Sequence, residues 1–217
     1  IELGNKALET KNSFHLALSG GSTPKAMFGL LAETPYREQI NWGLIDFWWG
    51  DERCVPPDHP DSNYGAAFQL LLSKVAVDKS KVHRMKAEQD PDQAAADYAA
   101  ELKSALGSQP QFDLVFLGMG PDGHTASLFP ESEALDADPG RLVAMNDDPL
   151  GVNPYRRMTL TFAGIARAHL VLVTVSGPEK ADALAAIARG EDLPASRIRA
   201  DRVVWLVDHE AASGLPA

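Results

Sequence analysis

The stretch from Phe112 to Pro130, FDLVFLGMGPDGHTASLFP, contains the residues best suited to chemistry. It begins with a short apolar run typical of a buried strand, and then breaks into a glycine-rich loop that contains Asp122 and His124. Because histidine titrates near neutral pH, His124 can serve as a general base or acid. Asp122 can orient its ring or accept a proton, so we predict proton-transfer chemistry on this loop.

The glycines between residues 118 and 123 also match the dinucleotide-binding pattern G-x-G-x-x-G. That pattern belongs to the first strand–helix turn of its fold, opens a long helix, and is followed by an acid that ends a second strand. Here earlier apolar runs precede the loop and Pro130 restricts any helix, while Asp136 and Asp138 lie in a segment without a strand pattern. We therefore expect no nicotinamide or flavin cofactor.

Charged residues follow two other apolar runs, namely Leu44–Trp49 before Gly50–Arg53 and His169–Val175 before Ser176–Lys180. Arg53 and Lys180, together with Arg157, are cations that could hold a phosphate group. Asp51 is a second carboxylate that could orient His124 or accept a proton. The sequence therefore predicts an anionic substrate beside the histidine.

A glycine- and hydroxyl-rich loop follows the first apolar run, Phe14–Leu18. Pro24 suits the first position of a helix and Thr23 its N-cap, and the expected apolar stripe consists of Ala26, Met27, Leu30 and Leu31. A strand, such a loop and a helix N-terminus together form an anion site, although the Walker pattern is absent. We predict that the phosphate binds to Gly20, Gly21, Ser22 and Thr23.

These segments must be positioned by alternating strands and helices. Helices are expected from a cap at Asp61–Asn63 to about Ser73 with Phe68 facing inward, over 91–106, and from Pro178 to about Arg189. Continuous apolar runs indicate a mostly parallel sheet covered on both faces, whose ligands bind at the carboxyl ends of the strands. Residues 156–162 alternate like a half-buried strand, and 131–156 are expected to be an irregular surface excursion that could cover the site.

Composition indicates one globular domain over residues 1–217, because the chain has 217 residues of which 45% are hydrophobic. The formal charge of −10 argues against nucleic-acid binding, and no apolar run approaches the ~20 residues that span a bilayer. The single cysteine, Cys54, fits a reducing compartment, so we expect a cytoplasmic protein. The chain begins at Ile1 rather than Met, consistent with a truncated N-terminus.

Other catalytic arrangements lack support in the sequence. Asp122 and His124 have no third metal ligand at a recognisable spacing, and the nucleophile elbow G-x-S-x-G is absent. Cys54 has no motif around it and is expected to pack passively. General-base chemistry on a phosphosugar remains, with no cofactor and no metal.

The motifs resemble those of 6-phosphogluconolactonase, a family related to glucosamine-6-phosphate deaminase. The matching segments run in order along nearly the whole chain: SGGSTP (Ser19–Pro24), GDER (Gly50–Arg53), SNY (Ser62–Tyr64), GMGPDGHTASLFP (Gly118–Pro130), RMTLT (Arg157–Thr161) and SGPEK (Ser176–Lys180). The resemblance implies a Rossmann-like three-layer α/β/α sandwich, and hydrolysis of 6-phospho-D-glucono-1,5-lactone to 6-phosphogluconate in the oxidative pentose phosphate pathway.

The resemblance also implies roles for individual residues. His124 would activate water, Asp51 and Asp122 would support it, and Arg53 and Lys180 would bind substrate, with the Ser19–Thr23 loop on the phosphate side. The expected partner is a small phosphorylated sugar lactone, without nucleic acid or membrane, and the protein is expected to be a monomer or weak oligomer.

Two alternatives follow from the same resemblance. The deaminase loop resembles G-x-D-G-H-I-A-F-N-E-P, with a glutamate before the proline, whereas here Phe129 precedes Pro130 and Glu131 follows it. The charged triplet of the deaminase usually ends in tyrosine, whereas here it ends in Arg53. Both departures favour the lactonase. A non-catalytic sugar-phosphate-binding regulator could lose the base and would usually carry a DNA-binding module, whereas this chain retains His124.

Overall fold

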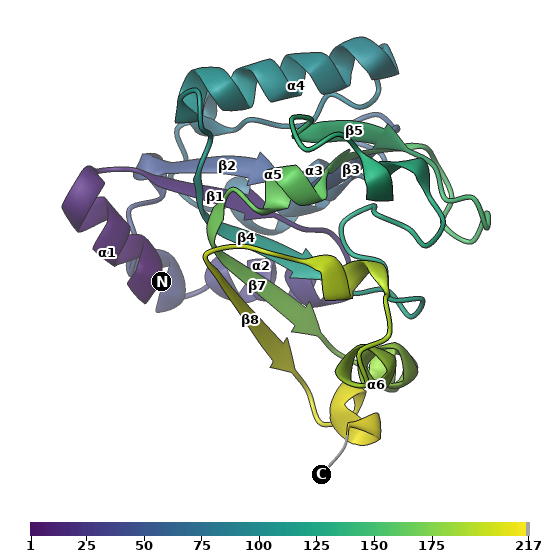
Figure 1. Ribbon diagram of the computed structural model, residues 1–217. Coiled ribbons are helices and arrows are strands. Elements are labelled where there is room, and N and C mark those ends of the chain that lie inside the picture. The colour runs from purple at the N-terminus through teal and green to yellow at the C-terminus, as the bar shows by residue number, and fades with distance from the viewer. Residues whose placement is uncertain (216–217) are drawn as a thin grey trace.

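A five-stranded parallel sheet forms the centre of the molecule (Figure 1). The computed structural model describes residues 1–215. The strand order is β2 (Ile45–Trp49), β1 (Phe14–Leu18), β4 (Phe112–Gly118), β7 (Ala168–Val175) and β8 (Arg202–Val207). The first four are the predicted apolar runs, and their continuous hydrophobicity reflects cover on both faces. The predicted α/β class with a mostly parallel sheet is confirmed.

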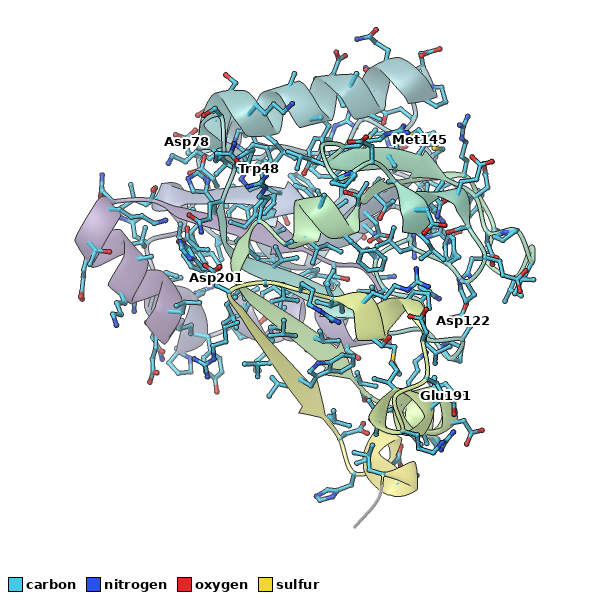
Figure 2. The ribbon with its side chains drawn as sticks, in the orientation of Figure 1. Trp48, Asp78, Asp122, Met145, Glu191 and Asp201 are labelled. Atoms are coloured by element: carbon cyan, nitrogen blue, oxygen red, sulfur yellow. The ribbon has the colours of Figure 1, made fainter. Side chains whose placement is uncertain are left out.

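Helices cover both faces of this sheet. Helix α4 (Pro91–Leu106) lies over one face, where Tyr98 contacts Trp48 edge-on and donates a hydrogen bond to the Trp49 carbonyl (Figure 2). On the other face, α1 (Glu2–Lys11) and α2 (Ser22–Leu31) border a small apolar cavity that they share with Leu16 and Leu114 of the sheet. The layers are completed by α3 (Asn63–Ala67), α5 (Phe162–Ile165) and α6 (Ala181–Ala188).

A second, antiparallel sheet lies beside the first, in the order β3 (Asp51–Arg53), β6 (Arg157–Leu160) and β5 (Val143–Asn146). The prediction that residues 131–156 are irregular surface was therefore wrong in part, because all four β5 residues are buried. The expected half-burial of β6 was also wrong, since its four residues are buried between β3 and β5. The sheet places Asp51, at the start of β3, opposite Thr159.

Helix α2 begins earlier than predicted. Its N-cap is Gly21, with φ of 101°, rather than Thr23, and no side chain caps it. The expected apolar stripe was wrong in part, because Met27 and Leu31 pack against the core but Ala26 and Leu30 are exposed. The buried residues of the helix are Pro24 and Phe28. Pro24 and Phe28 lie one turn apart, and this spacing places the buried face on their side of the helix.

The predicted helix after Asp61–Asn63 is present, but its second half is a π-helical turn, Phe68–Leu72, that continues α3. The Ser62 hydroxyl accepts a hydrogen bond from the Gly65 N–H at 2.9 Å and so caps the helix. Phe68, which was expected to face inward, is 45% exposed. The π-helical turn, which starts at Phe68, changes the direction of its side chains relative to α-helical spacing.

The remaining helical predictions are confirmed, since α4 has the predicted bounds and α6 continues a short 3₁₀ turn, Pro178–Lys180. No helix within residues 1–215 is long and apolar enough to cross a bilayer.

Candidate active site

A cavity of about 270 Å³ lies where the ends of β1 and β4 meet the antiparallel sheet. The predicted site residues that line it are Gly20, Gly21, Asp51, Arg53, His124, Arg157 and Lys180. Ser22, Thr23 and Asp122 were predicted as well but are not among the residues that line the cavity. The parallel sheet thus brings together loops that are up to 160 residues apart in the sequence, between Gly20 and Lys180.

His124 and Asp122 form a close pair on the loop after β4. The Asp122 carboxylate lies 2.6 Å from Nδ1 of His124, and the same oxygen accepts a hydrogen bond from the His124 backbone N–H at 3.1 Å. Burial opposes ionisation of Asp122, but the hydrogen bond and charge of His124 outweigh it and lower the pKa of this carboxyl. The pairing fixes the ring, with Nε2 left to act as the proton acceptor.

Two glycines allow this loop to close around the pair. A Cβ at Gly120 would lie 2.2 Å from Nδ1 of His124, so only glycine leaves room for the ring. Gly123 has φ of +77°, and its carbonyl accepts a hydrogen bond from Ala195 N–H at 2.9 Å. The glycines that resembled a nucleotide fingerprint therefore serve to position the histidine.

Phe129 connects the histidine to one of the cations. Its ring is 1% exposed and meets the His124 ring edge-on, with the centroids 5.0 Å apart. The Arg157 guanidinium carbon lies 5.8 Å from the centroid of the same ring, within the range of a cation–π contact. Phe129 thus contacts both His124 and Arg157, although it was not among the predicted site residues.

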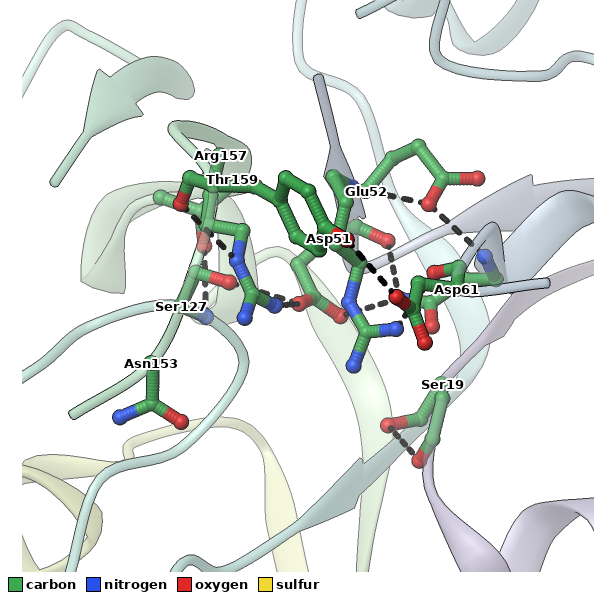
Figure 3. A network of polar contacts seen from close by, with 12 residues as sticks. Ser19, Asp51, Glu52, Asp61, Ser127, Asn153, Arg157 and Thr159 are labelled. Atoms are coloured by element: carbon green, nitrogen blue, oxygen red, sulfur yellow. Dashed lines mark hydrogen bonds and ion pairs between the residues drawn. The ribbon is translucent and has the colours of Figure 1, made fainter. Parts of the chain in front are cut away.

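Asp51 is fixed by a buried polar network (Figure 3). Its carboxylate accepts a hydrogen bond from the Ser127 hydroxyl at 2.7 Å and from the Asn63 amide at 3.1 Å. Nη1 of Arg157 lies 4.0 Å from the same carboxylate. Asp51 is 5% exposed, and these partners satisfy its buried carboxylate and hold it in place at the wall of the cavity.

Cations outnumber carboxylates in the cavity wall. Arg157 donates from Nε and Nη2 to the Pro154 carbonyl, and burial lowers the pKa of its guanidinium, with Asp51 acting in the opposite direction. Arg53 donates to the Asp61 carbonyl, while its buried Nε finds no hydrogen-bond partner among the described residues. Lys180, 19% exposed at the side chain, lies 3.6 Å from Glu179. This wall favours an anionic ligand.

The glycine loop after β1 adds backbone donors to the same wall. Ser22 and Thr23 form the first turn of α2, where N–H groups have no partner within the helix. A Cβ at Gly20 would lie 1.9 Å from the Asn63 amide oxygen, so glycine is required for this loop to approach α3. The loop and the cations together can hold a phosphate group.

Asn63 and Asn153 also line the cavity and were missed as site residues. Asn63 lies within the SNY segment, directly after the helix cap, so its position in that segment was an available signal. Asn153 lies in the segment taken as surface and is held by Asp148, which accepts its side-chain N–H at 2.9 Å. No pattern in the sequence marks it.

Two features outside these contacts limit the chemistry. Burial raises the pKa of the Cys54 thiol to about 11, which suppresses the nucleophilic thiolate. Within residues 1–215, no three His, Cys, Asp or Glu side chains are gathered as metal ligands. The base, the carboxylates and the cations are therefore the groups available to act on a ligand.

A Rossmann-like sheet that carries this histidine loop is typical of enzymes that act on sugar phosphates. The chain belongs to the family of glucosamine-6-phosphate isomerases and 6-phosphogluconolactonase, whose family model matches residues 1–205. Among its relatives, 6-phosphogluconolactonase of Haemophilus influenzae is 39% identical over 203 residues, covering 91% of this chain and 85% of the relative. That of Streptomyces coelicolor is 36% identical over 224 residues, covering 97% of this chain and 85% of the relative.

Solved structures show the same relationship. The crystal structure of 6-phosphogluconolactonase from Thermotoga maritima has a TM-score of 0.84 and 35% identity, and the match covers 95% of this chain and 90% of that one. A monomeric glucosamine-6-phosphate deaminase has a TM-score of 0.79 over 98% of this chain and 94% of that one, but only 21% identity, and shares the fold.

Proposed function

We propose that this chain hydrolyses 6-phospho-D-glucono-1,5-lactone to 6-phospho-D-gluconate, the lactone-opening step of the oxidative pentose phosphate pathway. The observation that carries the proposal is the pair formed by Asp122 and His124, in which a carboxylate oxygen lies 2.6 Å from Nδ1. His124 lines the same cavity as Arg53, Arg157 and Lys180. Membership of the family and the lactonase names of its relatives support the same reaction.

His124 is the base in this proposal. In this proposal Nδ1 carries a proton and donates a hydrogen bond to the Asp122 carboxylate. Nε2 therefore has a lone pair that accepts a proton from water. The resulting hydroxide attacks the lactone carbonyl, and the C–O bond to the ring oxygen then breaks. The proton taken up by Nε2 is available to that oxygen. The cycle therefore consumes one water and needs no redox cofactor.

The substrate anion is held on the other side of the cavity. The phosphate meets Gly20 and Gly21, with the first-turn amides of Ser22 and Thr23, and the cations complete its neutralisation. Asp51 supports the reacting ring as a fixed acceptor, because Ser127 and Asn63 hold its carboxylate.

The proposal is tested by comparing two activities of the purified protein, the opening of 6-phosphogluconolactone and the release of ammonia from glucosamine 6-phosphate. We expect rapid lactone opening and no ammonia release, because the buried phenyl ring of Phe129 lies beside His124 where the deaminase carries a glutamate. Ammonia release with slow lactone opening would identify a deaminase. Sugar-phosphate binding without either reaction would identify a regulator.

We further propose that residues 1–217 form one domain that works in the cytoplasm as a monomer or weak oligomer. The single cysteine supports a reducing compartment, and its half-buried thiol is poorly reactive. Gel filtration with light scattering across a range of protein concentrations measures the oligomeric state.

A further inference from the structure

A second cavity lies at the β2 edge of the parallel sheet and shares no lining residue with the candidate active site. Its volume is about 680 Å³, within the range of small-molecule sites. The walls come from the π-helical turn after α3, the segment up to Lys86, and Glu101 of α4. Val82 in this segment forms an isolated bridge with Phe47 of β2, which ties the cavity to the edge of the sheet.

One wall of the cavity is aromatic. The rings of Tyr64 and Phe68 are stacked, with centroids 5.9 Å apart and planes 29° apart. Phe68 is 45% exposed and is the first residue of the π-helical turn. Such turns occur frequently at functional sites. Arg84 supports the wall, with its guanidinium carbon 5.7 Å from the Tyr64 ring and its fork bonded to Glu88.

The rim of the cavity is positively charged. Three basic side chains line it, Lys79, Arg84 and Lys86, and Arg84 is paired with Glu88. Lys79 and Lys86 line the cavity, and neither forms an ion pair with any residue in the described part of the chain. Glu101 is the acidic residue of the wall, and its carboxylate is 2.7 Å from Nδ1 of His83. The basic rim is therefore available to an anion.

We propose that this cavity binds a nucleoside diphosphate. The flat base stacks on the exposed ring of Phe68, which is itself stacked against Tyr64, since base–aromatic stacking suits any π-face. The phosphates meet the free ammonium groups of Lys79 and Lys86. The pairing of an aromatic wall with a cationic rim suits a nucleotide better than a sugar phosphate, which has no planar aromatic ring to stack. This site is independent of the proposed lactonase reaction.

The test is calorimetric titration of the full chain with ADP, adenosine and inorganic phosphate, each used separately. We expect ADP to bind more tightly than either fragment, because it engages both the aromatic wall and the lysines. Phe68→Ala should weaken ADP binding about tenfold, as expected for the loss of one base stack, and should leave phosphate binding unchanged. Lys86→Ala should weaken the binding of ADP and of phosphate, but not that of adenosine.

Matched controls are Leu206→Ala, which removes a 53% exposed side chain on β8, and Lys6→Ala on α1. Neither should change ADP affinity, and lactone hydrolysis should be unchanged in all four variants. Because Phe68 is exposed, circular dichroism of its variant should match that of the parent. Absence of ADP binding, displacement of ADP by 6-phosphogluconate, or unchanged ADP affinity in a folded Phe68→Ala variant would each overturn the proposal.

Discussion

His124 differs from the other inner histidines in what its ring nitrogens contact. Both nitrogens of His83 are engaged, Nδ1 by Glu101 at 2.7 Å and Nε2 by Asp46 at 3.3 Å. Burial lowers the pKa of His15, and its Nδ1 has no hydrogen-bond partner among the described residues. His124 has one nitrogen held by a carboxylate and lines a cavity with the other side of its ring, the arrangement that a general base requires.

Replacing the base should abolish most of the activity. We expect His124→Ala to lower kcat by roughly 10²–10⁴-fold, the range for loss of a positioned acid–base group, with a smaller change in KM. Steady-state lactone opening, corrected for spontaneous hydrolysis, measures this. Asp122→Asn keeps the shape of the loop and should also lower kcat, by a smaller factor. A near-normal rate in His124→Ala would rule out the assigned role.

The cations should act on the phosphate of the substrate. We expect Arg53→Ala and Lys180→Ala each to lower kcat/KM for the phosphorylated lactone by about tenfold or more, because a charge-assisted contact is lost. Unphosphorylated gluconolactone should lose much less. Lys103→Ala, on the exposed side of α4, serves as the control. Equal losses on both lactones would place these cations at the carbonyl instead.

At the scale of elements, the buried Glu52 carboxylate joins β3 to the start of α3. It accepts hydrogen bonds from the Ser62 hydroxyl and from the backbone N–H groups of Asn63 and Tyr64, at 2.8 to 3.0 Å. Burial raises the pKa of this carboxyl, and hydrogen bonds from the backbone N–H groups of Tyr64, Asn63 and Arg53 act in the opposite direction. The junction places the Asn63 side chain between Asp51 and the loop at Gly20.

A methyl group at Gly20 should disturb this junction. Its carbon would lie 1.9 Å from the Asn63 amide oxygen, so we expect Gly20→Ala to lower kcat/KM and to destabilise the fold by about 1–3 kcal/mol. Denaturant unfolding and steady-state kinetics measure the two effects. Gly29→Ala is the matched control, because nothing lies within 4 Å of its Cβ and alanine favours the helix interior. Equal stability of both variants would contradict the steric argument.

The ionic contact that joins the strand β2, the segment at His83 and helix α4 should make stability depend on pH. Burial lowers the pKa of His83, but hydrogen bonds to Asp46 and Glu101 outweigh it and raise the pKa above 6.5. The stabilisation from charged His83 is therefore complete below pH 6.5 and is lost as the pH rises through the folded-state pKa. His15, with a lowered pKa, acts in the opposite direction.

We therefore expect His83→Gln to remove the loss of stability that this histidine causes above pH 6.5, while the contribution of His15 is unchanged. Free energies of unfolding from urea titrations at pH 6 and pH 8 measure the difference between variant and parent. His209→Gln, on an exposed residue, is the control. If stability depended on pH equally in His83→Gln and in the parent, protonation of His83 would not be coupled to folding.

At the scale of the whole molecule, a net charge of −10 surrounds a cavity walled by cations. The acidic surface repels an anionic substrate at long range, and the local cations attract it at short range. Binding of an anionic substrate therefore depends on how strongly salt screens the repulsion by the surface and the attraction by the cations.

Salt should therefore change binding more than chemistry. Partly buried cations are screened less than an exposed surface, so salt weakens the repulsion by the surface more than the attraction by the cations. We therefore expect KM for the phosphorylated lactone to fall by about two- to threefold between 0.05 and 0.5 M NaCl, with kcat nearly constant. Unphosphorylated gluconolactone should show almost no dependence. An equal salt effect on both lactones would indicate a general effect on the protein instead.

Residue types and local spacing were sufficient to predict the parallel strands, helix α4, and the loop at Asp122 and His124, because burial and helix capping depend on neighbouring residues. The location of the glycine loop after β1, Arg53 and Lys180 at one cavity followed from the rule that parallel strands share one ligand edge. The contact between Phe129 and Arg157 and the antiparallel sheet could not be predicted, since each depends on contacts between distant segments.

By itself, the sequence determined which groups are available for chemistry: a base with its carboxylate, a glycine loop and a set of cations. Only the tertiary structure decided which of them meet. Asp51 becomes a buried wall residue because β3 pairs with β6, and Asn153 reaches the cavity because Asp148 folds its loop back. The physical reason is that side-chain orientation depends on strand register and on packing between elements, and neither is encoded in local spacing.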